Sequence, residues 1–294
     1  MFSREMIQQG APSVLIEARA GRQSWSHAAG ARSLDGRVRV QADDVVRLGG
    51  LARTMVAVSV LKLVDAGRVR LDDPVAIYVP EAGVPAQAPL TVRQVLGRAP
   101  GTSGGGLSDD DILRILLERT RGFPLADVLR TDIVEPLNLR SLVMPEGGPA
   151  PANLVHGYAV VDGNTVDVTG SLPSGGVGII ASAADVSTFY ASLLGGKLLS
   201  QAGLVELKGP VFAEYGLGLD HWHDRCTNGS YYGHAADMPG GALISMSSAD
   251  GNRQLTIAVA SPPAPLSTRP SAIALEITGL AQVALNGSCR FQFR

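Results

Sequence analysis

The feature that most constrains the fold of this chain is residues 46–74, where a glycine turn is followed by a long apolar run and a second turn. Residues 45–48 are typical of a short strand, and Gly49-Gly50 predicts a turn. From about Leu51 to Asp65 apolar residues fill nearly every face of a helix, and such a helix is buried. We therefore predict a core helix whose N-terminus presents free N–H groups, a natural place for a nucleophile or an anion.

The same stretch resembles the nucleophile-bearing segment of serine β-lactamases and penicillin-binding proteins of the class C, esterase and D-Ala-D-Ala carboxypeptidase type. In that family an apolar helix follows a Ser-x-x-Lys motif and leads to Leu-Asp-Asp-Pro. Arg47, Gly67 and the run Leu71-Asp72-Asp73-Pro74 match the pattern. The register then puts Gly50 at the position of the serine and Arg53 at that of the lysine.

These two substitutions remove the chemistry that the resemblance implies. In the family the serine hydroxyl attacks a carbonyl carbon and the lysine helps to take its proton. Gly50 has no side chain with which to attack. Arg53 stays protonated at physiological pH, so it is a poor base, although its guanidinium can hold an anion. We predict that the scaffold is kept while the acyl-enzyme chemistry is lost or replaced.

The resemblance covers nearly the whole chain, from about residue 10 to residue 285. Further matches are Leu90-Thr91-Val92-Arg93, residues 132–139, Ser174-Gly175-Gly176 and Tyr215-Gly216-Leu217-Gly218. It implies an α/β (α+β) protein of the β-lactamase/transpeptidase-like fold, with an antiparallel sheet flanked by helices and a helical subdomain. We expect a single domain over residues 1–294, its α/β part at about 1–50 and 150–294 and its helical part at about 51–149.

The two other motifs of the family are also altered. Its Tyr-x-Asn sequence is absent, because no tyrosine lies between Tyr78 and Tyr158. Its Lys-Thr-Gly or His-x-Gly motif, on a strand that lines the pocket, reads His234-Ala235-Ala236, and Asp237 follows where the family usually has glycine. His234 and Asp237 are therefore the acid–base candidates. The alternative for His234 is an inherited strand residue with a structural hydrogen bond.

A site built on these positions would take a small anionic or carbonyl-bearing molecule. Arg53 would hold its negative charge, and His234 and Asp237 would move protons. The residues expected to contact it are Gly50, Ser103, Tyr158 and Ala236. We expect no cofactor and no metal.

Three functions remain open, because a fold does not by itself confer a function. The first, which we favour, is an enzyme of specialised metabolism that performs an isomerisation, cyclisation or elimination without an acyl-enzyme. The second is an inactive relative that binds a ligand or partner. The third is a hydrolase or esterase with a displaced nucleophile, such as Ser59 or Ser103.

Three other patterns have simpler interpretations. Ser59-Val60-Leu61-Lys62 is a literal Ser-x-x-Lys, but it starts nine residues after Gly50, about 13 Å further along the helix, and therefore lacks the motif's context. Ser108 and Asp111 are typical of a helix cap, as is Ser182. His221 and His223 would share a strand face, as metal ligands can, but a surface hairpin is the simpler interpretation.

Composition limits the partners and the compartment. A net charge of −2 gives no reason to expect nucleic-acid binding. No apolar run reaches the ~18 residues of a membrane span, and the N-terminus lacks a signal-peptide pattern. We therefore expect a cytoplasmic protein without a membrane contact. Cys226 and Cys289 could pair, but a cytoplasmic setting favours free thiols.

Overall fold

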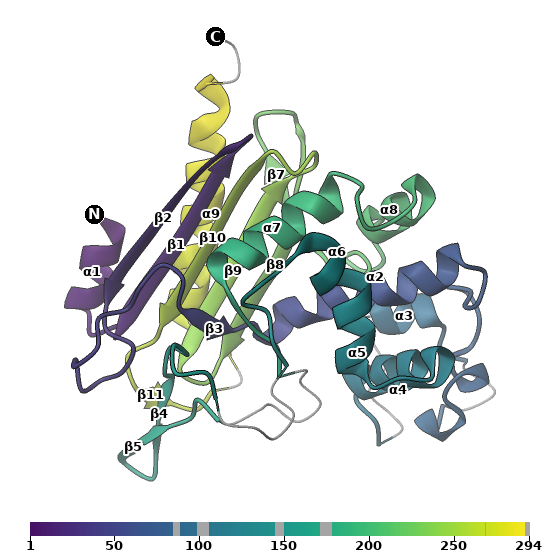
Figure 1. Cartoon of the computed structure of the whole chain (residues 1–294), viewed down its shortest axis with the longest axis horizontal. Helices are drawn as coiled ribbons and strands as arrows, with labels where there is room; N and C mark the ends of the chain where they lie inside the picture. The colour runs from purple at the N-terminus through teal and green to yellow at the C-terminus, as the bar shows by residue number, and fades with distance from the viewer. Residues whose placement is uncertain (85–88, 99–105, 145–149, 171–177, 268, 292–294) are drawn as a thin grey trace.

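The computed structural model describes residues 1–84, 89–98, 106–144, 150–170, 178–267 and 269–291. Its centre is a six-stranded antiparallel sheet in the order β2-β1-β10-β9-β8-β7 (Figure 1). The strands are β1 (Ser13–Ala20), β2 (Gln23–Gly30), β7 (Asp220–Asp224), β8 (Gly229–Met238), β9 (Gly241–Ser248) and β10 (Arg253–Ala260). Because β1 pairs with β10, the two ends of the chain meet in one sheet.

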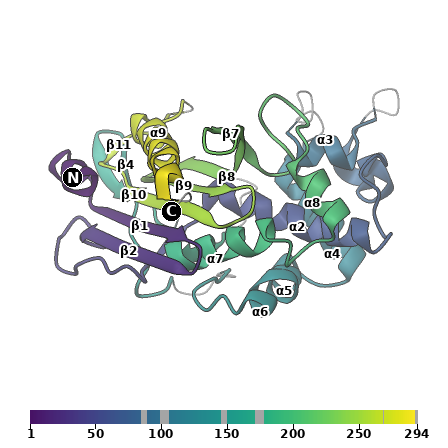
Figure 2. The same cartoon turned by 90° about the horizontal axis from the view of Figure 1, so that it is seen from above.

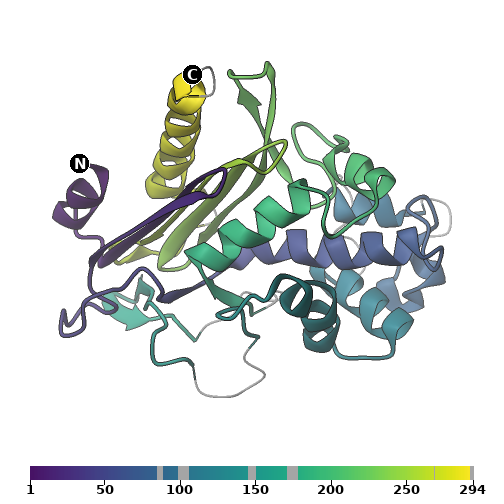
Figure 3. The same ribbon diagram turned by 45° about the horizontal axis from the view of Figure 1, so that its top comes forward.

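Helices cover both faces of this sheet (Figures 2 and 3). On one face α7 (Ala183–Leu194) packs on β1, β9 and β10. On the other, α9 (Ala272–Gly287) packs on β8, β9 and β10, and α1 (Phe2–Gln8) on β1 and β2. The strands alternate their side chains between the two faces, so each face has an apolar core of its own. The fold is therefore the β-lactamase/transpeptidase-like one that the sequence predicts.

The remaining helices form a group beside the sheet, around α2 (Ala52–Asp65) (Figure 1). The others are α3 (Val92–Leu96), α4 (Asp109–Arg121), α5 (Leu125–Leu129), α6 (Glu135–Leu137) and α8 (Gln201–Lys208). Helix α2 packs against α4, α5 and α8. Nearly all its side chains are buried, including Met55 and Leu61, so the prediction of a core helix is confirmed.

Short strands complete the structure. β3 (Val45–Arg47) pairs with β6 (Ile180–Ser182), and β4 (Tyr158–Val161) lies between β5 (Asn164–Asp167) and β11 (Ala264–Pro265). The two predicted caps are confirmed: the Ser108 hydroxyl accepts from the Asp111 N–H, and that of Ser182 accepts from the Asp185 N–H. The sequence analysis missed α1 and β11.

A row of polar side chains crosses the α7 face of the sheet and ends at His234. The register places Glu17 opposite Thr256, Thr256 opposite Ser245, and Ser245 opposite His234. The Ser245 and Thr256 hydroxyls are 2.9 Å apart, and the Ser26 hydroxyl donates to Glu17. This row is buried, and hydrogen bonds within it offset the cost of removing its groups from water.

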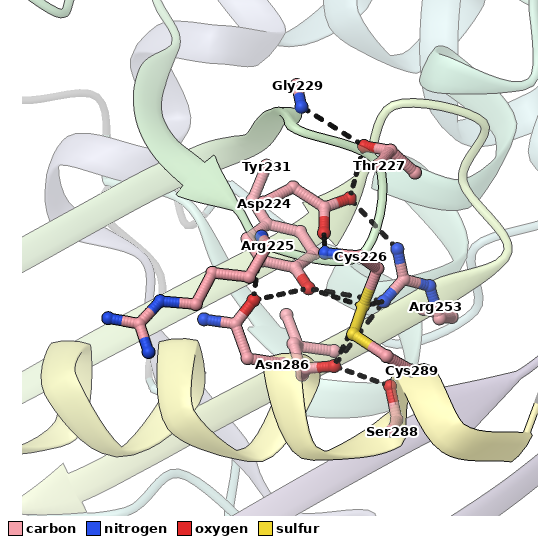
Figure 4. The surroundings of a disulfide bond; sticks show 11 residues. Asp224, Arg225, Cys226, Thr227, Gly229, Tyr231, Arg253, Asn286, Ser288 and Cys289 are labelled. Atoms are coloured by element: carbon pink, nitrogen blue, oxygen red, sulfur yellow. Dashed lines mark hydrogen bonds and ion pairs between the residues drawn. A yellow bond between two sulfur atoms is a disulfide. The ribbon is translucent and has the colours of Figure 1, made fainter.

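Cys226 and Cys289 form a disulfide, so the expectation of free thiols is wrong. Their Cα atoms lie 5.2 Å apart although the residues are 63 positions apart in sequence. Helix α9 runs back along the sheet and brings the chain end beside the β7–β8 hairpin (Figure 4). This approach depends on the tertiary fold, which cysteine counting does not reveal. Within the described part of the chain, no helix has the length and apolarity needed to cross a membrane.

Candidate active-site region

The N-terminus of α2 lies against β8, where the family resemblance places the site. The chain enters α2 through the 3₁₀ turn Gly49–Leu51, which packs on β8. A Cβ atom added to Gly50 would lie 2.9 Å from Cε1 of His234, closer than two carbon atoms approach without contact strain. The imidazole ring therefore occupies the space that a side chain at position 50 would need.

His234 is held by hydrogen bonds on both ring nitrogens. Its side chain is buried, and Nδ1 lies 2.7 Å from the Ala235 carbonyl oxygen. Because a carbonyl only accepts, Nδ1 carries the proton and donates it there. Nε2, 3.2 Å from the Tyr215 hydroxyl, then accepts from that hydroxyl. The tautomer is assigned from these partners.

Burial keeps this pair neutral. It lowers the pKa of His234 from its ordinary value near 6.5, and it raises the pKa of Tyr215 to about 12. At pH 7 the histidine is therefore a neutral imidazole, protonated on Nδ1 alone, and the tyrosine is a hydrogen-bond donor. A neutral imidazole can accept a proton, but only from a group that reaches it.

Asp220 is the carboxylate that lies beside His234. Its Oδ2 is 3.6 Å from Nδ1 of His234 and accepts the Ala235 N–H at 2.9 Å. Its charge favours the protonated imidazole and so opposes the effect of burial on the pKa of His234. The sequence analysis missed Asp220. The β7–β8 pairing brings position 220 opposite position 233, and this approach has no signal in the local sequence.

Asp237 is not brought to His234. The two residues are three positions apart in β8, so their side chains leave opposite faces of the strand. The exposed Asp237 carboxylate accepts the Ser271 N–H, and at 3.0 Å the Ser271 hydroxyl, at the start of α9. These hydrogen bonds join β8 to the start of α9.

Arg53 is buried between three helices. Its guanidinium donates to the Asp110 carboxylate, to the Val95 carbonyl at the end of α3, and to Asp109 at 3.4 Å. Its side chain is 3% exposed. Carboxylates at the start of α4 therefore compensate the positive charge of Arg53, which the sequence predicts to bind a ligand anion. They also complement the positive end of the α4 dipole.

The expected contact residues fall into separate places. Ala236 is buried on the same face of β8 as His234, and its Cβ would lie 3.3 Å from a Cβ on Gly49. Tyr158 instead lines, with Asp237 and Arg269, a cavity of about 490 Å³ near the start of α9. Ser103 lies outside the described residues.

The Ser59–Lys62 pattern and the His221/His223 pair do not form a catalytic or metal site among the described residues. Ser59 is fully buried inside α2, and within the described residues its hydroxyl has no hydrogen-bond partner. His221 and His223 do share a face of β7. However, the described residues contain no group of three or more histidine, cysteine or acidic side chains arranged to hold a metal ion.

Comparisons with known proteins agree with this fold. D-amino acid amidase from Ochrobactrum anthropi SV3, solved with L-phenylalanine, superposes with a TM-score of 0.81 at 18% identity, covering 97% of each chain. A D-stereospecific amidohydrolase from Streptomyces sp. gives 0.74 at 23% identity, covering 88% of this chain and 92% of that one.

Sequence comparison identifies the family. The bovine (Bos taurus) mitochondrial serine β-lactamase-like protein LACTB is 33% identical over 85 residues. That segment covers 27% of this chain and 15% of the bovine protein. The sequence model described as Beta-lactamase matches residues 1–111 and 105–266. Since these matches span most of the sequence, the chain belongs to the β-lactamase family.

Proposed function

We propose that this chain is a β-lactamase-family protein that forms no acyl-enzyme and binds a small-molecule ligand without hydrolysing it. The contact between Gly50 and the His234 ring carries this proposal. An acyl-enzyme needs a nucleophile at the helix start and open space in front of it for the acyl group. Position 50 supplies no nucleophile, and the ring stands where its side chain would be.

The contacts of Arg53 and Asp237 support a binding function over a catalytic one. The enzyme hypothesis, which the sequence favours, assigns an anion to Arg53 and proton transfer to His234 and Asp237. Arg53 is paired with Asp110, and Asp237 accepts the hydroxyl of Ser271, the N-cap residue of α9. Two of those three groups are thus engaged in structural contacts.

Non-covalent acid–base catalysis in specialised metabolism remains the second candidate. The Tyr215–His234 hydrogen bond supports it, because a neutral imidazole beside a tyrosine hydroxyl is a suitable proton acceptor and donor pair. For this function a substrate must reach a histidine that is 2% exposed. Burial of this degree favours a structural role for the pair.

The ligand class follows from the structural neighbours. The Ochrobactrum amidase has been solved with D-phenylalanine and with L-phenylalanine amide. We propose amino acid amides and short peptide amides as the ligands of this chain, held as an uncleaved complex. Their uncharged amide and carbonyl groups suit a site whose cation is already paired.

The test measures binding and turnover on the same sample. Calorimetric titration with L- and D-phenylalanine amide should give saturable heat, while chromatography of the mixture detects no phenylalanine above the protein-free blank. Saturable binding in a His234→Asn variant would fit the binding role as well. Turnover that His234→Asn abolishes would establish the acid–base enzyme instead, and the absence of binding would contradict the proposed ligands.

A second assay addresses the displaced nucleophile. Intact-protein mass after incubation with a β-lactam, and separately with a fluorophosphonate, should show no adduct. A stoichiometric adduct that Ser59→Ala or Ser103→Ala removes would restore an acyl-enzyme hydrolase and overturn the proposal.

A further inference from the structure

The two sulfur atoms of the disulfide lie in different surroundings (Figure 4). Arg253, on β10, is 5% exposed, and its Nη1 lies 2.7 Å from Sγ of Cys226. The Tyr231 hydroxyl is 3.6 Å from the same sulfur. Among the described residues, Sγ of Cys289 makes no hydrogen bond, and its partner is Cys226 alone. One sulfur is therefore cradled by a cation and a hydroxyl.

Arg253 is held firmly in this position. Its Nη2 donates to Oδ2 of Asp224 at 2.9 Å, and its Nη1 also reaches the Tyr231 hydroxyl at 3.1 Å. Asp224 in turn accepts the Cys226 N–H and the Thr227 hydroxyl. Asp224 thus binds the other terminal nitrogen of the guanidinium and the backbone of Cys226, while the charged group in direct contact with the Cys226 sulfur is Arg253.

We propose that Cys226–Cys289 is a thiol–disulfide exchange site with a fixed polarity, at which a dithiol reductant attacks Cys289 and Cys226 leaves as a thiolate held by Arg253. A sulfur that departs as an anion leaves faster when a cation stabilises it. The buried guanidinium of Arg253 supplies that cation at hydrogen-bond distance.

Reduction proceeds in two exchange reactions. A thiolate of the reductant forms a bond to Sγ of Cys289, the Cys226–Cys289 bond breaks, and its electron pair remains on Sγ of Cys226. The second thiol of the reductant then displaces Cys289, which takes up one proton, while the other proton goes to solvent. The reductant ends as a disulfide, and the protein is reduced by two electrons to a Cys289 thiol and a Cys226 thiolate.

The end of α9 has contacts that do not depend on the disulfide. Oδ1 of Asn286 accepts the Tyr231 hydroxyl at 3.2 Å and the Arg225 N–H at 3.1 Å. Arg253 also donates to the Leu285 carbonyl. Reduction should therefore leave α9 on the sheet and free only the residues that follow it, which makes the bridge suitable for reversible opening.

The first experiment measures the rate of reduction by dithiothreitol at pH 7, with free thiols counted by alkylation and intact mass. Arg253→Met should slow reduction by about three- to tenfold, because the leaving sulfur loses its cation. Arg225→Gln is the matched control, since this exposed side chain points away from the disulfide (Figure 4). It should reduce at the wild-type rate. Equal rates in all three proteins would overturn the proposal.

The second experiment uses a disulfide-intact wild-type protein and so does not depend on a variant of buried Arg253. Brief exposure to glutathione, acid quenching and peptide mapping should locate the mixed disulfide on Cys289. Glutathione on Cys226, or equal amounts on both, would contradict the polarity.

The third experiment titrates each thiol alone. In Cys289→Ser, alkylation of Cys226 by iodoacetamide should have a pH midpoint below the ~8.5 of an ordinary thiol. In Cys226→Ser, Cys289 should titrate near that ordinary value. A midpoint for Cys226 at or above that of Cys289 would also overturn the assignment.

Discussion

The absence of a side chain at Gly50 and the position of the His234 ring depend on each other. A Cβ atom at position 50 would come within 2.9 Å of Cε1 of His234. The ring is fixed by Tyr215 on one nitrogen and the Ala235 carbonyl on the other. Relief of the contact must therefore disturb at least one of these hydrogen bonds.

Gly50→Ala should accordingly lower the free energy of unfolding by about 1–3 kcal/mol, the usual cost of overpacking. Urea denaturation followed by circular dichroism measures it. Gly279→Ala is the matched control, because a Cβ there meets nothing within 4 Å. At this exposed position of helix α9 it should raise the free energy of unfolding by up to about 1 kcal/mol. A Gly50→Ala protein as stable as the wild type would show that the ring moves freely.

Part of the site can be predicted from the sequence because it depends on local register. The family pattern aligns Gly50 and Arg53, and their places at the start of α2 follow from it. Strand alternation alone separates Asp237 from His234, since the residues are three apart. Asp220 and Tyr215 come from other elements, so their approach to His234 depends on pairing and packing that no local pattern encodes.

At the scale of elements, Arg53 joins three helices. It extends from α2 to the end of α3 and to the first turn of α4. A buried cation of this kind is costly to remove from water and depends on its partners for compensation. Its role is to fix how the helical group packs.

Arg53→Met should lower the free energy of unfolding by about 1–3 kcal/mol, because it leaves the Val95 carbonyl without its donor and removes the ion pair with Asp110. Arg70→Met serves as the control: this side chain is 83% exposed and 3.9 Å from Asp73, so its loss should cost at most about 1 kcal/mol. Thermal and urea unfolding compare the two. Equal effects would mean that the Arg53 ion pairs contribute no more than a surface pair.

The disulfide should stabilise the folded chain by restricting the unfolded one. For a loop of 63 residues the chain-entropy estimate is about 4 kcal/mol, and measured effects run from about 2 to 4 kcal/mol. Cys289→Ser should therefore unfold at lower urea concentration than the oxidised wild type. The reduced wild type should match the variant. If the oxidised protein were no more stable than the variant, the disulfide would not stabilise the fold.

Elements with strong local signals were predictable, and those without them were not. Helix α2 has its continuous apolar run, and α4 and α7 have serine caps that the structure contains. The short helix α1 has no cap hydrogen bond, and the two-residue strand β11 exists only because β4 lies beside it. Their formation depends on contacts made after the chain folds.

At the scale of the whole molecule, buried histidines link stability to pH. Burial lowers the pKa of both His234 and His221. The unfolded chain, with histidine pKa values near 6.5, then binds more protons than the folded chain as the pH falls. Stability from these groups is complete above about pH 6.5 and declines as the pH drops below it toward the folded-state values.

We expect the free energy of unfolding to fall between pH 7 and pH 5, and to fall less in His234→Asn. His223→Asn, at an exposed position of the same hairpin, should keep the wild-type slope. Urea unfolding at half-unit pH steps measures the three slopes. An identical slope in His234→Asn would show that His234 does not contribute to this dependence.

The packing around α2 also constrains the order in which substitutions could introduce an acylating site. A serine at position 50 meets the His234 ring before it meets any substrate, and a lysine at position 53 inherits the carboxylates that now pair with arginine. Each of these substitutions is therefore destabilising when it is made first, and only a coordinated set of substitutions could succeed. The packing around positions 50 and 53 therefore fits glycine and arginine better than the serine and lysine of the motif.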